Sequence, residues 1–237
     1  MNVLTDASYG EYLRGKRVAV VGRSPSLLGS CQGELIDGYD AIVRINLLLP
    51  YGLPTDSYII NEVVACDIGS RTDIVYTHPF RSLDCDTWLA EMQRYIEAGV
   101  KYLLHSFPKE EYSTQNLPID AFLECTPDGL PVRPIPFKMY RWLYRMIGAQ
   151  PTSGFSAFVD VLRFPVKEIG LFGFTCFQLP KELGDKEYLN APPSRHNADL
   201  EWEMWKAFIK VDRRVHVEKV LGALIGGDYR RILGASE

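Results

Sequence analysis

Short apolar runs alternate with amphipathic stretches along most of this chain. Runs rich in β-branched residues predict buried strands at residues 17–22, 41–46, 73–77, 100–105 and 168–174. Apolar residues three and four apart predict helices at residues 86–98, 138–147, 154–162 and 197–211. This alternation indicates an α/β fold, with a mostly parallel central sheet and helices on both faces.

One segment departs from this pattern. Residues 106–137 contain six prolines and little periodicity, which predicts a long loop or lid. The chain has 237 residues, a length that fits a single domain over residues 1–237.

Charge and cysteine content narrow the possible partners and the compartment. The net charge is −4 and no tract is dense in Lys or Arg, so we expect no nucleic-acid partner. Five cysteines are scattered without CxxC spacing, which predicts reduced thiols rather than a disulfide framework or a zinc site. No apolar window reaches membrane-spanning length. We therefore expect a cytoplasmic protein with no integral membrane segment; its oligomeric state cannot be read from the sequence.

The loop at residues 22–30 (GRSPSLLGS) follows the first predicted strand. Ser24 is a candidate N-cap with Pro25 at the first helical position, and N–H groups at a helix start attract anions such as phosphate. Ser26 adds a second hydroxyl donor. The loop lacks both the GxGxxG spacing of dinucleotide sites and the GK[ST] of a P-loop. A tight turn without a ligand is the alternative interpretation.

A second loop, residues 151–155 (PTSGF), opens another predicted helix. Thr152 or Ser153 is the candidate cap, and Gly154 would let a ligand approach the backbone. Both loops would lie at the carboxyl edge of the sheet, where ligands bind in α/β folds. Together they predict an anion site better than either does alone.

His196 is the candidate general base. It precedes Asn197, a plausible N-cap, and the positive end of that helix would favour the neutral imidazole that a base requires. A surface histidine beside a cap is the alternative, and His78 is a weaker rival. The four histidines show no metal-ligand spacing.

Asp84-Cys85-Asp86 forms a DxD pattern. Such a pattern can hold Mn²⁺ or Mg²⁺ with a sugar diphosphate. Because it directly precedes a predicted helix, a helix cap is the simpler interpretation.

In order and spacing, these segments resemble the eukaryotic-type sialyltransferase family. Residues 18–46 (VAVVGRSPSLLGSCQGELIDGYDAIVRIN) are similar to its large motif, with Asp37, Asp40, Arg44 and Asn46 in register. Residues 67–72 (DIGSRT) resemble the segment that often follows. Residues 151–155 with 172–174 (FGF) resemble the small motif, and His196 with Glu201 the H-x4-E motif.

The resemblance implies a Rossmann-like glycosyltransferase fold, a GT-A-like variant, that transfers an acidic sugar from a CMP-sugar to a glycan hydroxyl. It implies inversion and needs no metal or cofactor. His196 would be the catalytic base and Glu201 a supporting residue. The implied nucleotide-binding residues are Gly22, Arg23, Ser24, Ser26, Asn46, Thr152, Ser153, Gly154 and Gly173.

The sequence also departs from the family pattern. Arg23 and Ser26 replace two loop asparagines, and Val18 and Leu162 replace the paired cysteines. The missing disulfide fits a bacterial or viral protein in a reducing compartment. The HYY[DE] motif is absent, and residues 186–189 (KEYL) stand near its place. Two alternatives stay open: a nucleotide-binding protein without transferase activity, and a metal-dependent UDP-sugar transferase using Asp84 and Asp86.

Overall fold

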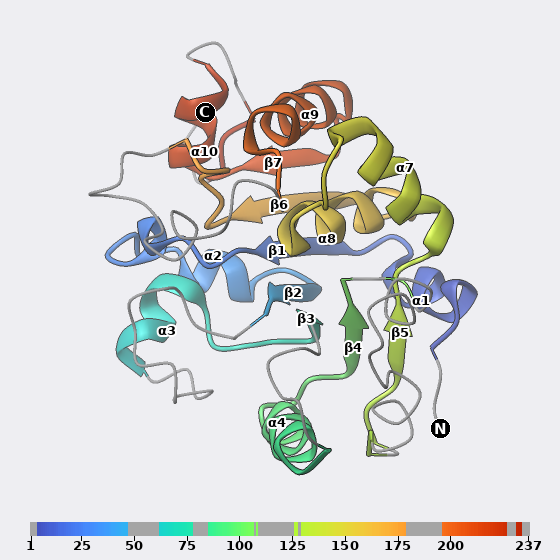
Figure 1. Ribbon diagram of the computed structural model, residues 1–237. Helices are drawn as coiled ribbons and strands as arrows, with labels where there is room; N and C mark the ends of the chain where they lie inside the picture. The colour runs from blue at the N-terminus through green and yellow to red at the C-terminus, as the bar shows by residue number, and fades with distance from the viewer. Residues whose placement is uncertain are drawn as a thin grey trace.

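A parallel sheet of seven strands, in the order β5-β4-β3-β2-β1-β6-β7, forms the centre of the computed structural model of the protein (Figure 1). The structure describes residues 4–46, 62–77, 85–106, 108, 126–127, 129–178, 196–226 and 231–233. The strands are β1 Arg17–Val21, β2 Ala41–Ile45, β3 Ile74–Thr77, β4 Tyr102–His105, β5 Val132–Pro134, β6 Glu168–Phe172 and β7 Val215–Val217. The predicted α/β fold with a mostly parallel sheet is confirmed.

Helices connect most of these strands. They are α1 Asp6–Leu13, α2 Gly33–Asp37, α3 Glu62–Ile68, α4 Cys85–Glu97, α7 Phe137–Ile147, α8 Ser153–Leu162, α9 Ala198–Val211 and α10 Lys219–Ile225, with the short 3₁₀ helix η1 Pro25–Leu27. All five predicted strands and all four predicted helices are present, with small shifts at their ends. The interpretation of residues 106–137 as one long loop was wrong at its end, because it contains β5 and the first residue of α7. Residues 109–125 lie outside the described residues.

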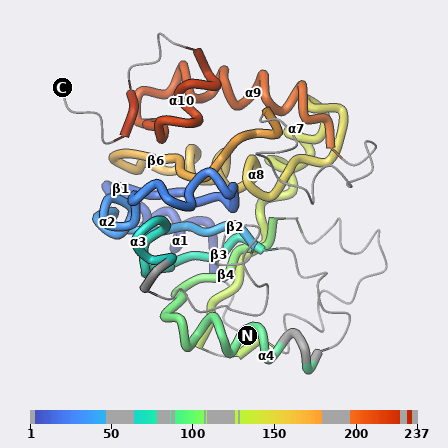
Figure 2. The backbone as a smooth tube through the Cα atoms, turned by 90° about the vertical axis from the view of Figure 1, so that its left-hand side faces the viewer, coloured from blue at the N-terminus to red at the C-terminus, as the bar shows by residue number. Residues whose placement is uncertain are grey.

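Both faces of the sheet are covered by helices (Figures 1 and 2). Val18 and Val20 of β1 belong to the hydrophobic cluster that also holds buried residues of α7, α8 and α9. Ala19 and Val21 point the other way and pack in a second cluster with Ile36 of α2. Alternate side chains of one strand therefore enter two different cores, which explains why the strand sequence is apolar throughout.

The order of the strands fixes where a ligand can bind. The chain builds the sheet outwards from β1 to β5 and then returns to the other side of β1 with β6. The carboxyl ends of β1 and β6 therefore flank the point at which the strand order reverses. Open α/β sheets bind their ligands in the crevice at this point.

A buried ion network fastens β5 to the helices that cover it. Arg133 of β5 donates two hydrogen bonds to Asp160 of α8, at 2.7 and 3.0 Å. Its Nε donates to Asp6 of α1 at 2.6 Å. Tyr76 of β3 and Arg163 also donate to Asp160. This network ties together four elements that are distant in sequence.

Candidate active site

A cleft opens at the carboxyl ends of β1, β2 and β6 and encloses about 510 Å³, part of it open to solvent. It lies at the reversal of strand order. Its lining includes eight residues predicted from the sequence: Gly22, Arg23, Ser24, Asn46, Thr152, Gly154, Gly173 and Glu201. The two predicted loops therefore face one cavity.

The ends of β1 and β6 approach each other closely at this cleft. The N–H of Gly22 donates to Phe172 O at 2.8 Å, and the N–H of Ser24 donates to Gly173 O at 3.0 Å. A Cβ on Gly22 would lie 2.3 Å from Gly173 O, and Gly173 has a φ of +66°. Both glycines are required by the backbone geometry, because a side chain at either would clash or be strained.

Ser24 forms the predicted cap in the first loop. Its hydroxyl accepts the N–H of Ser26 at 3.2 Å, and Pro25 follows as the first residue of η1. Arg23, only 8% exposed, adds a positive charge to the cleft. A serine hydroxyl and a guanidinium suit a phosphate.

Asn46 ends β2 in the left-handed region, with a φ of +60°. Asparagine tolerates this conformation better than most residues do. Its N–H donates to Tyr76 O, and its carbonyl accepts from the Tyr95 hydroxyl at 3.2 Å. The backbone is held on both sides, so the side chain keeps a defined position at the cleft.

The second loop is built around a buried carboxylate. Glu201 of α9, 2% exposed, accepts the N–H of Thr152 at 2.9 Å and its hydroxyl at 2.5 Å. Thr152 in turn caps α8 by accepting the N–H of Phe155. Both donors of Thr152 are therefore used by Glu201. Gly154 has no room for a side chain, since a Cβ would lie 2.8 Å from the ring of Phe174.

Burial raises the pKa of Glu201 to about 7, although its bonds to Thr152 lower it. The folded chain then binds this proton more tightly than the unfolded chain, so its stabilising effect is present below pH 4.5 and lost as the pH rises through 7. We expect wild type to lose on the order of 3 kcal/mol of unfolding free energy relative to Glu201→Gln between pH 5 and 8. Urea denaturation of both proteins across this range measures it, and parallel pH profiles would contradict it.

His196 lies just before α9 and outside the cleft lining, and it contacts Gln150, the residue before the second loop. Its Nδ1 is 2.7 Å from Gln150 O, and a carbonyl oxygen only accepts hydrogen bonds. Nδ1 therefore carries the proton, and Nε2 is the basic nitrogen of the neutral ring. Asn197 is the N-cap of α9, as predicted, and accepts the N–H of Leu200.

Two other predicted residues do not line the cleft. The Ser153 hydroxyl is 3.0 Å from that of Ser106, beyond the end of β4. Ser26 contributes its N–H to the Ser24 cap. Of the alternative site residues, His78, Asp84 and residues 186–189 lie outside the described residues. Asp86 is in the first turn of α4 and exposed.

Sequence reasoning missed one wall of the cleft and one residue beneath it. Thr175, Cys176 and Phe177 line the wall, with Cys176 and Phe177 both at positive φ. Consecutive left-handed residues other than glycine store strain, which is typical of ligand sites. No local pattern marks such a turn in a sequence.

Glu218, fully buried, supports the cleft from beneath. Its carboxylate accepts the N–H of Gly173 at 2.8 Å and the amide of Gln32 at 3.1 Å. Burial raises the pKa of Glu218. It lies 45 residues from Gly173 in the chain, so only the fold brings the two together.

The motif residues outside the cleft hold the segment at residues 67–72 in place. Arg44, 1% exposed, donates to Ile68 O at 2.8 Å and to the Thr72 hydroxyl at 2.9 Å. Asp37 accepts from the backbone N–H groups of Ser70 and Arg71. The segment at residues 67–72 is thus bound to the large-motif segment.

None of the described helices has the length and apolar character that crossing a membrane needs. The described cysteines Cys31, Cys66 and Cys176 are free thiols. Val18 and Leu162 stand where the resemblance implied paired cysteines; Val18 is buried in a hydrophobic cluster, and Leu162 packs against that cluster.

Comparison with known proteins gives a partial family match and a shared fold. Residues 5–117 match glycosyltransferase family 29 (sialyltransferase). A search of curated protein sequences found no match. A mammalian sialyltransferase in complex with Gal-beta-1-3GalNAc-ortho-nitrophenol is 19% identical with a TM-score of 0.55, covering 92% of this chain and 74% of that one.

Two bacterial structures have the same fold. An alpha-2,3-sialyltransferase from Campylobacter jejuni is 12% identical with a TM-score of 0.56, covering 100% of this chain and 86% of that one. The sialyltransferase CstII from Campylobacter jejuni, in complex with the substrate analogue CMP-3FNeuAc, is 14% identical with a TM-score of 0.52. The match covers 94% of this chain and 89% of that one. The match over residues 5–117 supports the resemblance to the sialyltransferases of family 29 and indicates a glycosyltransferase, and the chain shares the fold of these sialyltransferase structures.

Proposed function

We propose that this chain transfers an acidic sugar from a CMP-sugar to a glycan hydroxyl, with inversion and without a metal ion in the reaction. The sugar is sialic acid or a related 2-keto acid sugar such as Kdo. One observation carries the proposal: residues of the large and small motifs and Glu201 of the H-x4-E motif, which are far apart in sequence, line one cleft at the reversal of strand order. The CstII structure holds CMP-3FNeuAc in the same fold.

In this proposal the residues that line the cleft, together with Ser153 and His196 beside it, have distinct chemical roles. Arg23 and Ser24 bind the CMP phosphate, and Asn46, Ser153 and Gly154 bind the nucleoside. His196 Nε2 accepts the proton of the acceptor hydroxyl, which attacks the anomeric carbon as the bond to CMP breaks. CMP leaves with a single phosphate, whose charge a guanidinium and hydroxyl donors can stabilise without a divalent cation.

Nucleotide binding tests the donor. In the presence of EDTA, CMP at 100 times its Kd should raise the free energy of unfolding by about 2.7 kcal/mol, measured as a higher melting temperature. AMP at the same concentration controls for nucleoside specificity and should give a smaller shift. A shift only with UDP and Mn²⁺, and none with CMP, would favour the metal-dependent alternative.

Transfer itself needs a separate assay. With CMP-sialic acid as donor, an acceptor panel including Gal-β1-3GalNAc, the disaccharide in the mammalian structure, should give a glycan carrying one added sugar, detected by mass spectrometry. CMP binding without any product across the panel would support the alternative of a binding protein without turnover.

We also propose that the protein works in a reducing compartment such as a bacterial cytoplasm. The apolar pair Val18 and Leu162 and the free thiols support this. Mass spectrometry of the protein alkylated in intact cells should then find no disulfide-linked peptides, whereas such peptides would exclude this compartment.

A further inference from the structure

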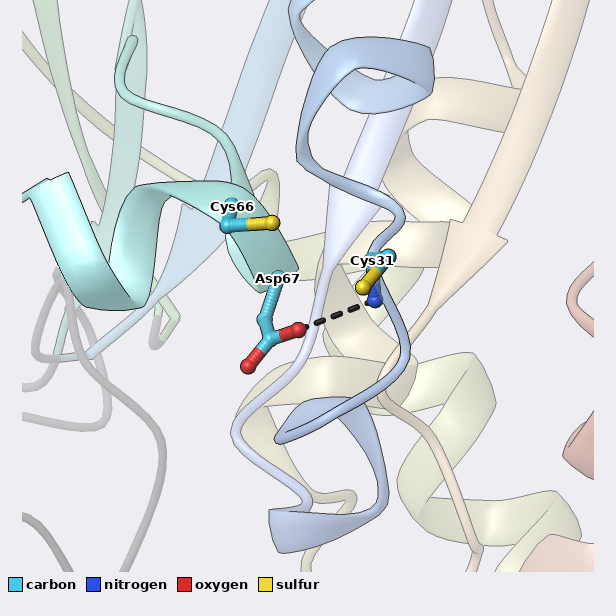
Figure 3. Close-up of side chains that lie close together, drawn as sticks. All are labelled: Cys31, Cys66 and Asp67. Carbon is cyan, nitrogen blue, oxygen red and sulfur yellow. Dashed lines mark hydrogen bonds between the residues drawn. The ribbon is translucent and has the colours of Figure 1, made fainter.

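A group of metal-ligating side chains lies between the segment that follows η1 and the end of α3 (Figure 3). The ligand atoms of Cys31, Cys66 and Asp67 all lie within 4.8 Å of one another. Cys31 follows η1, whereas Cys66 and Asp67 are in the last turn of α3. None of the three lines the cleft, so this group is separate from the proposed active site.

Backbone hydrogen bonds hold the three residues in place. Asp67 Oδ2 accepts the N–H of Gly29 at 2.7 Å, and Oδ1 accepts the N–H of Cys31 at 2.9 Å. Cys31 has a φ of +52°, an unusual conformation for a residue with a side chain. The fold therefore brings two thiols from separate segments within 4.8 Å of each other beside a carboxylate.

This ligand set indicates which ion would bind. Thiolates favour soft and borderline metals, whereas Mg²⁺ and Ca²⁺ prefer all-oxygen sites. Ligand atoms around a tetrahedral Zn²⁺ lie roughly 3–4 Å apart, so small side-chain rotations would bring these three onto one ion. Each Asp67 oxygen keeps a second lone pair after accepting its backbone N–H. Both cysteines are exposed, which gives an ion access and leaves the fourth position to water.

We propose that Cys31, Cys66 and Asp67 form a zinc-binding site with three protein ligands. Both thiols lose their protons on binding, and Zn²⁺ then links the end of the first loop to α3. The sequence gives no sign of such a site, because Cys31 and Cys66 are 35 residues apart and not in CxxC spacing. The proposal does not depend on the activity of the cleft.

Cobalt substitution tests the site directly. The reduced full-length chain is titrated with Co²⁺, which replaces Zn²⁺ and gives thiolate charge-transfer bands only when cysteine sulfur binds it. Wild type and the matched control Cys176→Ser should show these bands at one Co²⁺ per chain, and Zn²⁺ should abolish them. Cys31→Ser and Cys66→Ser should each lose most of the band intensity.

A second measurement separates metal loss from misfolding. Circular dichroism should be unchanged in both serine variants, since both cysteines are exposed, and Zn²⁺ should raise the melting temperature of wild type but not of Cys31→Ser. Absence of charge-transfer bands in wild type would overturn the proposal, as would bands that survive both substitutions. A purified chain two hydrogens lighter, with Cys31 and Cys66 in one disulfide-linked peptide, would also overturn it.

Discussion

Replacing His196 with alanine is expected to lower kcat by about 10²–10⁴-fold, the usual cost of a lost general base. CMP binding should survive, because His196 does not line the cleft. The assay is initial-rate transfer from CMP-sialic acid to the best acceptor of the panel, with the CMP melting-temperature shift measured on the same preparations.

The expected size of this effect rests on the hydrogen bond that His196 makes. Gln150 O accepts from Nδ1 at 2.7 Å, which selects the tautomer with a basic Nε2 and fixes the ring plane. Orientation and tautomer are therefore both set before substrate binds.

His216→Ala is the matched control for this variant. His216 is in the edge strand β7 and outside the cleft lining, so its loss should leave kcat close to that of wild type. If His196→Ala also turned over at the wild-type rate, with CMP binding intact, His196 would have no part in the proton transfer.

The strands that the sequence predicted are those buried on both faces. In β1 and β6 almost every residue is apolar and enclosed, so the pattern is strong over a short run. Strands β5 and β7 were missed because they have three residues each and contain Pro134 and His216 respectively. An edge strand of this length gains its register from its neighbour rather than from its own pattern.

The residues of the candidate site also fall into those that have a local sequence signal and those that only the fold brings together. Loops that begin a helix carry local signals, a cap followed by proline or glycine, and Ser24 and Thr152 were found in this way. The residues that hold the cleft from elsewhere in the chain were not predicted. Glu218, for example, is brought to Gly173 by the pairing of β6 with β7. Glu201 was predicted from the family resemblance, but its contact with Thr152 could be seen only in the folded structure.

Arg133→Met is expected to have the largest effect on stability, a loss of about 3–5 kcal/mol of unfolding free energy. The side chains of Arg133 and Asp160 are 3% and 0% exposed, so removing the guanidinium leaves a carboxylate in the core. Tyr76 still donates to Asp160, and Arg163 still contacts it from the edge, but neither fills the position that Arg133 occupied. Urea denaturation measures the loss as a lower midpoint.

Arg163→Met is the matched control, because it removes another guanidinium from the same carboxylate. Arg163 contacts Asp160 at 2.6 Å, closer than the 2.7 Å of Arg133, but its side chain is 33% exposed. Solvent screens that charge, so the expected loss is about 1 kcal/mol or less. Equal losses in the two variants would contradict the argument from burial. If burial of the charge determines the loss of stability, the double variant Arg133→Met with Asp160→Leu should be more stable than Arg133→Met alone. The double variant leaves no uncompensated charge in the core.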